Sequence, residues 1–194
     1  GALLTSPVKM FTRAFDINAA ANVVLAQAFL PAMISNNHGH FMTVASSASY
    51  FSLPNLCAYS MSKTAALAFL ESLRAELRAV YKACRVRTSV VTPTKVRTVL
   101  AEGLNEGDDD FLMPVLEPIQ VARAMADTLN SGLSRNISLP LGSALLPYLR
   151  ALPEWYRGAL RAMGNTDALV TPESISRGLQ VIRGHQSNGD HMKE

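Results

Sequence analysis

The stretch that decides the fold is YSMSKTAALAFLESLRAELRAV, residues 59–80. It contains neither proline nor glycine and is rich in Ala, Leu, Glu and Arg, which favour helices. Four leucines recur at spacings of three and four residues, so on a helix they form one apolar stripe. They are Leu67, Leu70, Leu73 and Leu77. The sequence therefore predicts a long helix whose leucine stripe packs against a core.

The residues before this helix predict another helix and then a strand. Residues 10–35 are Ala-rich with a helical apolar pattern, and Pro31 within them predicts a kink or a local ending. The turn sequence NNHG, residues 36–39, is expected to stop this helix. Residues 40–46, HFMTVAS, form a short apolar run that is typical of a buried strand.

The residues after the long helix repeat this alternation. Residues 85–91, RVRTSVV, predict a second strand, which we expect to end at Pro93. Residues 118–129 predict an amphipathic helix, and residues 136–139 predict a last short strand. Strands that alternate with helices predict a parallel sheet in an α/β fold.

Composition favours one globular domain and argues against several classes of site. Of the 194 residues, 48% are hydrophobic and 17% are charged. The net charge is +3, and the Lys and Arg residues are scattered along the chain. We therefore expect no nucleic-acid partner, which usually requires a clustered basic face. Cys57 and Cys84 make no disulfide framework, and no Cys or His spacing fits a metal site. No serine lies in the GxSxG motif of a hydrolase.

The start of the chain and its apolar runs bear on targeting. The first residues, GALLTSP, lack a basic residue followed by a long apolar stretch, so we expect no signal peptide there. Because the first residue is not Met, the sequence reads as a fragment. No uninterrupted apolar run reaches the roughly 20 residues that cross a bilayer, so we expect no membrane-spanning segment.

Four polar residues are candidates for chemistry. Tyr59 and Lys63 share one face of the predicted helix, and a cation near a phenol lowers the phenol pKa, although a surface Tyr and Lys would show the same spacing. Ser46 ends the strand at residues 40–46, where α/β sites form, and could orient a carbonyl or stabilise its oxyanion. Asn18 lies in the first helix, where a capping or solvent-facing role is the simpler interpretation.

In order and spacing, Asn18, Ser46, Tyr59 and Lys63 resemble the Asn-Ser-Tyr-Lys tetrad of classical short-chain dehydrogenases/reductases. The strings HGHFMTVASSAS, AYSMSKTAALAF and RVRTSVVTPTKVRT are similar to that family's serine strand, its AYxxSKxA helix and its strand followed by Pro-Gly-x-Val-x-Thr. The resemblance covers residues 1–140. It implies a Rossmann-like doubly wound parallel sheet, and an oxidoreductase that interconverts an alcohol and a ketone or aldehyde.

The resemblance also implies roles for the four residues. Tyr59 is expected to be the general acid/base, with Lys63 lowering its pKa and holding the nicotinamide ribose. Ser46 is expected to position the substrate oxygen, and Asn18 to hold the water that links Lys63 to solvent. We therefore expect Ser46, Tyr59 and Lys63 to converge on one cleft, with Asn18 behind Lys63.

The cofactor implied is NAD or NADP. Pro93, Val96 and Thr98 are expected to contact its nicotinamide end, together with Tyr59 and Lys63. The sequence departs from the family by lacking the Gly-rich loop TGxxxGxG and the residue that selects between the two cofactors, and Thr94 replaces the usual Gly. We therefore expect an N-terminally truncated fold, without the first strands, that is weak or inactive alone. The alternative is an inactive fragment or a dimerising scaffold.

The C-terminal string LPYLRALPEWYRGALRAMG, residues 146–164, is similar to the retinol and 17β-hydroxysteroid dehydrogenase-like branch. That branch implies a lipophilic substrate of retinoid, steroid or fatty-alcohol type, and a place on the cytoplasmic side of the endoplasmic reticulum or on lipid droplets. Aromatic and Leu residues beside arginines suit a helix at a membrane interface, but a substrate lid or core helix is equally consistent.

These observations divide the chain into three parts. Residues 1–140 are the expected catalytic domain, residues 141–169 an apolar lid or membrane-interface segment, and residues 170–194 a polar flexible tail. The partners expected from the resemblance are a small lipophilic substrate, a peripheral membrane contact and, in a full-length protein, a second copy of the chain.

Overall fold

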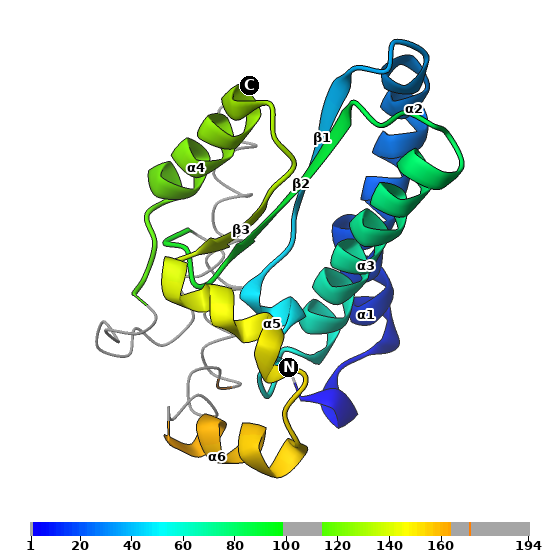
Figure 1. Cartoon of the computed structure of the whole chain (residues 1–194). Helices are drawn as coiled ribbons and strands as arrows, with labels where there is room; N and C mark the ends of the chain where they lie inside the picture. The colour runs from blue at the N-terminus through cyan, green and yellow to red at the C-terminus, as the bar shows by residue number, and fades with distance from the viewer. Residues whose placement is uncertain (1, 99–113, 164–170, 172–194) are drawn as a thin grey trace, which may run out of the picture.

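A three-stranded parallel sheet lies at the centre of the protein (Figure 1). The computed structural model describes residues 2–98, 114–163 and 171. The strands are β1 (Gly39–Val44), β2 (Val86–Pro93) and β3 (Asn136–Leu139), in the spatial order β1-β2-β3. The predicted strands and their parallel pairing are thus confirmed. The expected flexible tail at residues 170–194 lies outside the described residues, apart from Thr171.

One face of the sheet is covered by α3 (Cys57–Ala79) and by the long helix before β1 (Figure 1). The leucine stripe of α3 is buried along its whole length, as the spacing predicted. It packs with Phe41 of β1 and with Val86 and Val90 of β2 in one hydrophobic core. Each fully buried Leu contributes about 1.5–3 kcal/mol through its apolar area. This stripe therefore fixes the side of α3 that faces the sheet.

The long helix runs from Val8 to Ser35 in three parts. These are α1 (Val8–Phe15), a single π-helical stretch η2 (Asp16–Ala20) and α2 (Ala21–Ser35). The expected local ending at Pro31 is wrong, because α2 continues to Ser35. Proline has no N–H, so one backbone carbonyl in the preceding turn of α2 loses its donor. Because Pro31 lies on the exposed side of the helix, that carbonyl can bind water instead. The departure from α-helical geometry occurs instead around Asn18.

This continuous helix is also long and apolar enough to cross a membrane, by length and composition alone. The sequence showed no uninterrupted apolar run because Asn18, Asn22 and Gln27 interrupt it. In the structure α1 and η2 pack against α3, and α2 packs against β1. We therefore interpret the helix as part of the folded domain.

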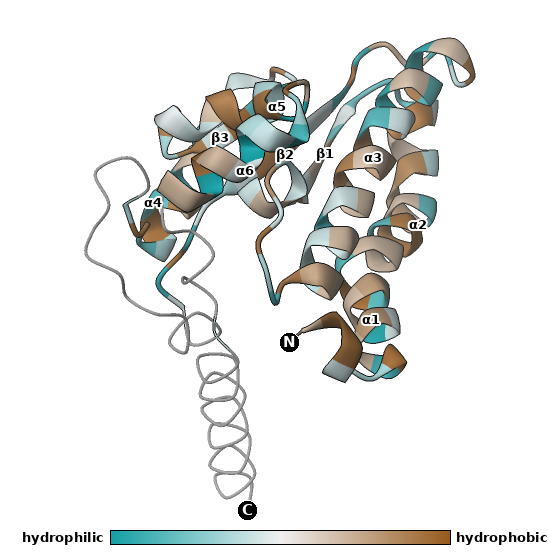
Figure 2. Cartoon of the chain, turned by 90° about the horizontal axis from the view of Figure 1, so that it is seen from below, coloured by the Kyte–Doolittle hydropathy of each residue, from teal (hydrophilic) through white to brown (hydrophobic). Residues whose placement is uncertain are grey.

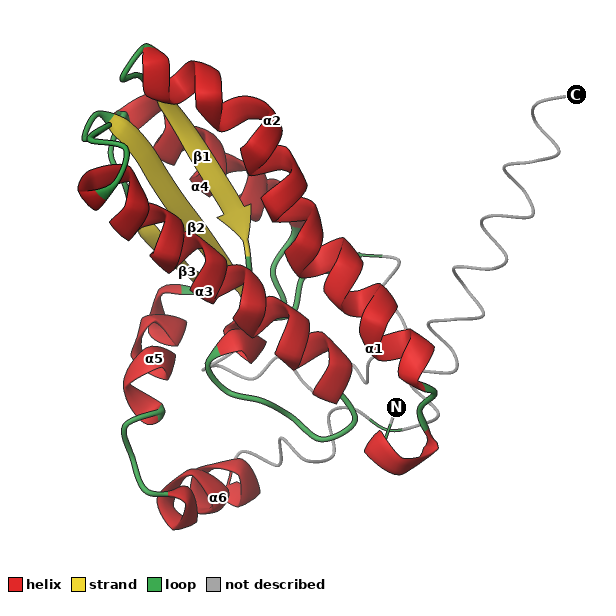
Figure 3. Ribbon diagram, turned by 90° about the vertical axis from the view of Figure 1, so that its right-hand side faces the viewer, coloured by secondary structure: helices red, strands yellow, loops and turns green. Residues whose placement is uncertain are grey.

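The opposite face of the sheet is covered by α4 (Pro118–Ser131), as the side view shows (Figure 3). A capping box between Glu117 and Gln120 starts this helix, and Gly132 ends it in the left-handed conformation that glycine tolerates best. β1 joins β2 through α3, and β2 joins β3 through α4, moving in one direction across the sheet. With α3 and α4 on opposite faces, the two crossovers have opposite hands. One of the two crossovers is therefore left-handed, whereas about 98% of such connections are right-handed.

Short helical turns complete the described chain. η1 (Leu3–Thr5) precedes α1, and η3 (Ser47–Ser49) follows β1. After β3 come η5 (Leu141–Leu145), α5 (Leu146–Leu149) and α6 (Glu154–Met163), which lie toward the end of the sheet where β1 and β2 finish (Figure 1).

Candidate active site

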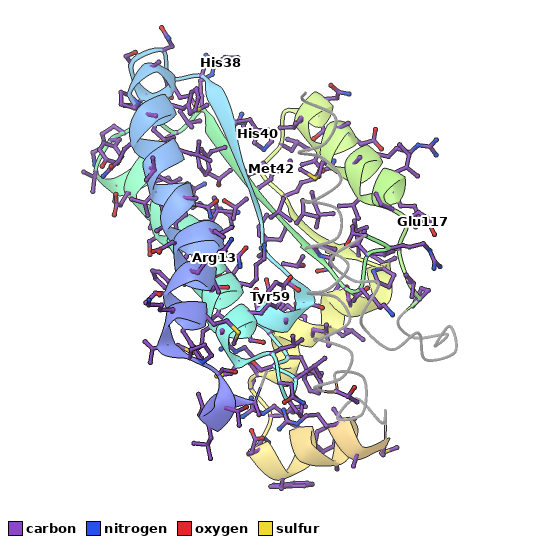
Figure 4. The ribbon with its side chains drawn as sticks, turned by 180° about the vertical axis from the view of Figure 1, so that it is seen from behind. Arg13, His38, His40, Met42, Tyr59 and Glu117 are labelled. Carbon is purple, nitrogen blue, oxygen red and sulfur yellow. The ribbon has the colours of Figure 1, made fainter. Side chains whose placement is uncertain are left out.

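The predicted site residues lie at the carboxyl ends of β1 and β2. Ser46 follows β1 at the start of η3, Pro93 is the last residue of β2, and Tyr59 and Lys63 lie in the first two turns of α3. Figure 4 shows Tyr59 at this end of the sheet, far from His38 at the start of β1. Ligands of open α/β sheets bind at this edge.

Tyr59 and Lys63 lie on the same face of α3. The ammonium nitrogen of Lys63 is 5.9 Å from the centre of the Tyr59 ring. It donates a hydrogen bond to the carbonyl of Val44, the last residue of β1, at 2.9 Å. This bond ties α3 to β1, and the ammonium has two more hydrogens to donate.

Ser46 connects the two strand ends to Tyr59. Its hydroxyl donates to the carbonyl of Pro93 at 3.5 Å and accepts from the backbone N–H of Ala48 at 3.2 Å. It also lies near enough to the phenol of Tyr59 to lower the pKa of that group. Because Ser46 is almost fully buried, its hydroxyl is held in place beside the phenol.

The pKa values differ from those that the Tyr-Lys spacing suggested. Burial raises the pKa of Tyr59 above its ordinary value, and the nearby Ser46 hydroxyl only partly opposes this. Burial also lowers the pKa of Lys63. The expected lowering of the Tyr59 pKa by Lys63 is thus absent here, because burial of the phenol dominates and only the Ser46 hydroxyl opposes it. In this state the phenol is a proton donor at neutral pH.

Asn18 reaches α3 through a residue that sequence reasoning missed. Its amide donates to the Ser62 hydroxyl at 3.0 Å, and Ser62 donates to the backbone carbonyl of Tyr59 at 2.8 Å. The carbonyl of Asn18 accepts from the Asn22 side chain at 2.8 Å. Asn18 therefore braces the turn that carries Tyr59 by its hydrogen bond to Ser62, and its expected water link to Lys63 stays a prediction. The buried serine next to Lys63 in the motif was the available signal.

The loop after β2 holds the remaining candidates. Pro93 lies against Ser46, whereas Val96 is fixed farther along by a strand-like bridge to Leu116. Thr98 donates to the carbonyl of Val96 at 3.4 Å and is exposed. No hydrogen bond joins Val96 or Thr98 to Tyr59 or Lys63 among the described residues. The structure thus brings Pro93 to the site, while the cofactor contact of Val96 and Thr98, which lie on the same loop, stays a prediction.

The sequence matches the short chain dehydrogenase family over residues 3–109, more than half of the chain. Estradiol 17-beta-dehydrogenase 11 of Pongo abelii is 38% identical over 77% of this chain. Epidermal retinol dehydrogenase 2 of Mus musculus is 36% identical over 65% of it. The matched residues span 48% and 40% of those two relatives, so the chain covers about half the length of the relatives it matches.

Solved structures share the fold. A 3-oxoacyl-[acyl-carrier protein] reductase from Brucella melitensis has a TM-score of 0.61 at 19% identity, over 72% of this chain and 55% of that one. Serine dehydrogenase from Escherichia coli has a TM-score of 0.57 at 20% identity, over 71% and 56%. The identity with these relatives, the family match over residues 3–109 and the parallel sheet all indicate the same family. The chain therefore belongs to the short-chain dehydrogenase family, in its retinol and hydroxysteroid dehydrogenase-like branch.

Proposed function

We propose that this chain is the catalytic portion of an NAD(P)-dependent oxidoreductase that interconverts an alcohol and a ketone or aldehyde. The observation that carries the proposal is the grouping of Ser46, Tyr59 and Lys63 at the ends of β1 and β2. A buried phenol, a fixed hydroxyl and an ammonium with spare hydrogens are the groups that proton transfer to a carbonyl oxygen needs.

Tyr59 is the proposed general acid/base. In the reductive direction its phenol donates the proton to the carbonyl oxygen as the alcohol forms. In the oxidative direction its phenolate takes the proton from the alcohol. When substrate binds, the single hydroxyl hydrogen of Ser46 turns from the Pro93 carbonyl to the same substrate oxygen and holds it beside the phenol. Asn18 acts through Ser62, because it braces the helical turn that carries Tyr59.

The residues present fit the nicotinamide end of the cofactor. Lys63 uses one hydrogen on Val44, so two remain for the hydroxyls of a ribose. Thr94, beside Pro93, has a buried hydroxyl oxygen without a partner among the described residues, and a bound group could supply that partner. We propose that Lys63, Pro93, Val96 and Thr98 hold this end. When bound, the nicotinamide exchanges the hydride, and its oxidised form adds positive charge that favours the phenolate.

A lipophilic alcohol of retinoid, steroid or fatty-alcohol type is the proposed substrate. Two relatives are named for estradiol and retinol. A 7 alpha-hydroxysteroid dehydrogenase solved with NADH has the same fold, with a TM-score of 0.58 at 20% identity over 71% of this chain and 57% of that one. We assign residues 1–140 to the catalytic domain and residues 141–169 to the segment that covers the substrate or meets a membrane.

The helix α6 supports a peripheral membrane contact, and by analogy with the branch we propose the cytoplasmic side of the endoplasmic reticulum or lipid droplets as its place. Large apolar residues lie on its exposed side, while two arginines that pair with the exposed Glu154 are half-buried. Trp155 and Met163 are 74% and 84% exposed, whereas the side chains of Arg157 and Arg161 are only 28% and 21% exposed. Arg161 lies over the ring of Phe51, 5.4 Å from its centre, and so turns toward the protein. An apolar outer face suits an interface with lipid.

A homodimer is the proposed assembly of the complete enzyme. Hydrophobic residues, brown in Figure 2, recur along α1 and α2. Ile17, Val24 and Phe29 are each more than half exposed. An exposed apolar face of this kind typically marks an interface. Sedimentation at micromolar concentration tests this assembly, and a strictly monomeric complete protein would contradict it.

The second candidate is an inactive fragment or dimerising scaffold. The observation that favours it is the missing Gly-rich loop in residues 1–194, since that loop binds the pyrophosphate of a dinucleotide.

The experiment joins this chain to a Gly-rich nucleotide-binding half and measures NAD(P)-dependent oxidation of retinol and estradiol. In the Tyr59→Phe variant we expect turnover to be lost, about 100-fold or more, because only the proton-transfer group is removed. Binding of NADH should stay nearly unchanged. Tyr81→Phe, at an exposed tyrosine beyond the end of α3, is the matched control. Substantial activity in Tyr59→Phe would show that another residue is the acid/base.

A further inference from the structure

A hollow of about 280 Å³ lies at the amino ends of β1 and β2, opposite the end that carries Tyr59. Figure 4 shows His38 and His40 at this end of β1. The volume lies just below the usual range of drug-sized ligand pockets, so it suits a small ligand. The described residues that line it include two arginines and two histidines but no acid: His38, His40, Arg85, Arg87, Leu129 and Gly132.

Two basic side chains face each other across β1 and β2 at this end of the sheet. His40 and Arg87 are direct partners in the register of β1 and β2, an arrangement that is unfavourable when both are charged. Burial first, and then Arg87, lowers the pKa of His40. The imidazole of His40 is therefore neutral at neutral pH and bonds to the Ser89 hydroxyl at 2.9 Å. The positive charge in the hollow comes from Arg85 and Arg87.

The Arg87 guanidinium is held in place by two backbone carbonyls. Its Nε donates to Gly132 at 2.9 Å, and an Nη donates to Cys84 at 3.3 Å. These neutral acceptors leave the charge uncompensated. Arg85 is exposed; its backbone N–H bonds to Asn37, and its guanidinium has no ion pair among the described residues. One guanidinium is thus fixed, and a second lies two residues away beside the same hollow.

We propose that this hollow binds a phosphate group, as free phosphate or as a small phosphomonoester. Each guanidinium presents a planar fork of N–H donors that matches phosphate oxygens. A phosphate dianion neutralises both arginines, whereas a monocarboxylate leaves one charge uncompensated. The imidazoles of His38 and His40 add hydrogen-bonding groups at the rim. This site is separate from the proposed catalytic residues and does not depend on their function.

The test is calorimetric titration of the protein with inorganic phosphate, glycerol 3-phosphate and acetate at constant ionic strength. We expect saturable binding of a phosphate species and none of acetate over the same range. Arg85→Gln should weaken phosphate binding about tenfold or more, because a charge-assisted hydrogen bond is lost. Arg13→Gln, an exposed arginine at the end of α1 that lies far from the hollow (Figure 4), should have no effect.

Arg85 is the better first variant because Arg87 also bonds to two carbonyls that hold the fold. Arg85→Lys should recover part of the affinity, since the charge remains but the fork is lost. Tighter binding of glycerol 3-phosphate identifies a phosphomonoester, and equal binding identifies free phosphate. Lack of saturation by either, equal affinity for acetate, or an Arg85→Gln variant that binds phosphate as the native chain does would overturn the proposal.

Discussion

At the scale of single residues, Tyr59 combines two opposing influences on its pKa. Burial raises the pKa, and the nearby Ser46 hydroxyl lowers it. The residue is therefore suited to donate a proton at neutral pH, and its use as a base depends on groups that stabilise the phenolate. The Ser46 hydroxyl is such a group within the described chain.

Ser46→Ala should therefore change the pH dependence of the reaction. Without the hydroxyl the Tyr59 pKa rises further, so the phenolate that oxidation needs forms only at higher pH. We expect the rising limb of kcat for alcohol oxidation to move to higher pH, with a lower rate at neutral pH. The measurement is the pH profile of kcat, with Ser47→Ala as the neighbouring control. A limb that stays in place would show that Ser46 does not tune Tyr59.

Sequence reasoning placed these residues together but misjudged the Tyr59 pKa. The i, i+4 spacing of Tyr59 and Lys63 and the position of Ser46 after a strand were enough to predict one site. The pKa depends on how much water reaches the phenol. That is decided by the packing of η3, α1 and α3, which a motif does not contain.

At the scale of elements, the helix from Val8 to Ser35 shows what the hydrophobic pattern of a sequence can predict and what it cannot. Its existence follows from its composition, and its continuation past Pro31 follows from the exposed position of that residue. The π-helical stretch could not be read from the pattern, because it forms where Asn18 meets Ser62 on another helix. Such stretches are frequent at functional sites.

A double-mutant cycle on Asn18 and Ser62 tests this contact. We expect Asn18→Ala to reduce the free energy of unfolding by about 1 kcal/mol, since one partly buried hydrogen bond is lost. The double variant should lose less than the sum of the two single variants. The measurement is urea unfolding of all four proteins, and strictly additive losses would mean that the two residues act independently.

The exposed apolar residues of α6 give a second prediction at this scale. Trp155→Ser with Met163→Ser should weaken binding to phosphatidylcholine vesicles, because most of the exposed large apolar area of α6 is removed. Cosedimentation measures the bound fraction. Leu133→Ser, an exposed leucine after α4, is the control. Unchanged binding would favour the interpretation of α6 as a lid over the substrate.

At the scale of the whole molecule, the 194 residues include the proposed proton-transfer residues but no Gly-rich loop. A dinucleotide is held largely through its pyrophosphate, at a Gly-rich turn and a helix N-terminus. We therefore expect the 194-residue chain alone to show no saturation by NADH or NADPH up to about 1 mM, a concentration that corresponds to only about −4 kcal/mol of binding free energy. Fluorescence titration of the purified chain checks this. Micromolar binding would mean that the nucleotide site lies within these residues.

The change of face between the two crossovers places the two crossover helices, α3 and α4, on opposite sides of the sheet. Asn18, Ser46, Tyr59 and Lys63 all precede residue 64, and the helices that carry or brace them cover one side of the sheet. The second half of the chain supplies α4, β3 and the C-terminal helices, with α4 on the other side of the sheet. We therefore expect substitutions in α4 to disturb the proposed proton-transfer residues less than substitutions in α1 or α3.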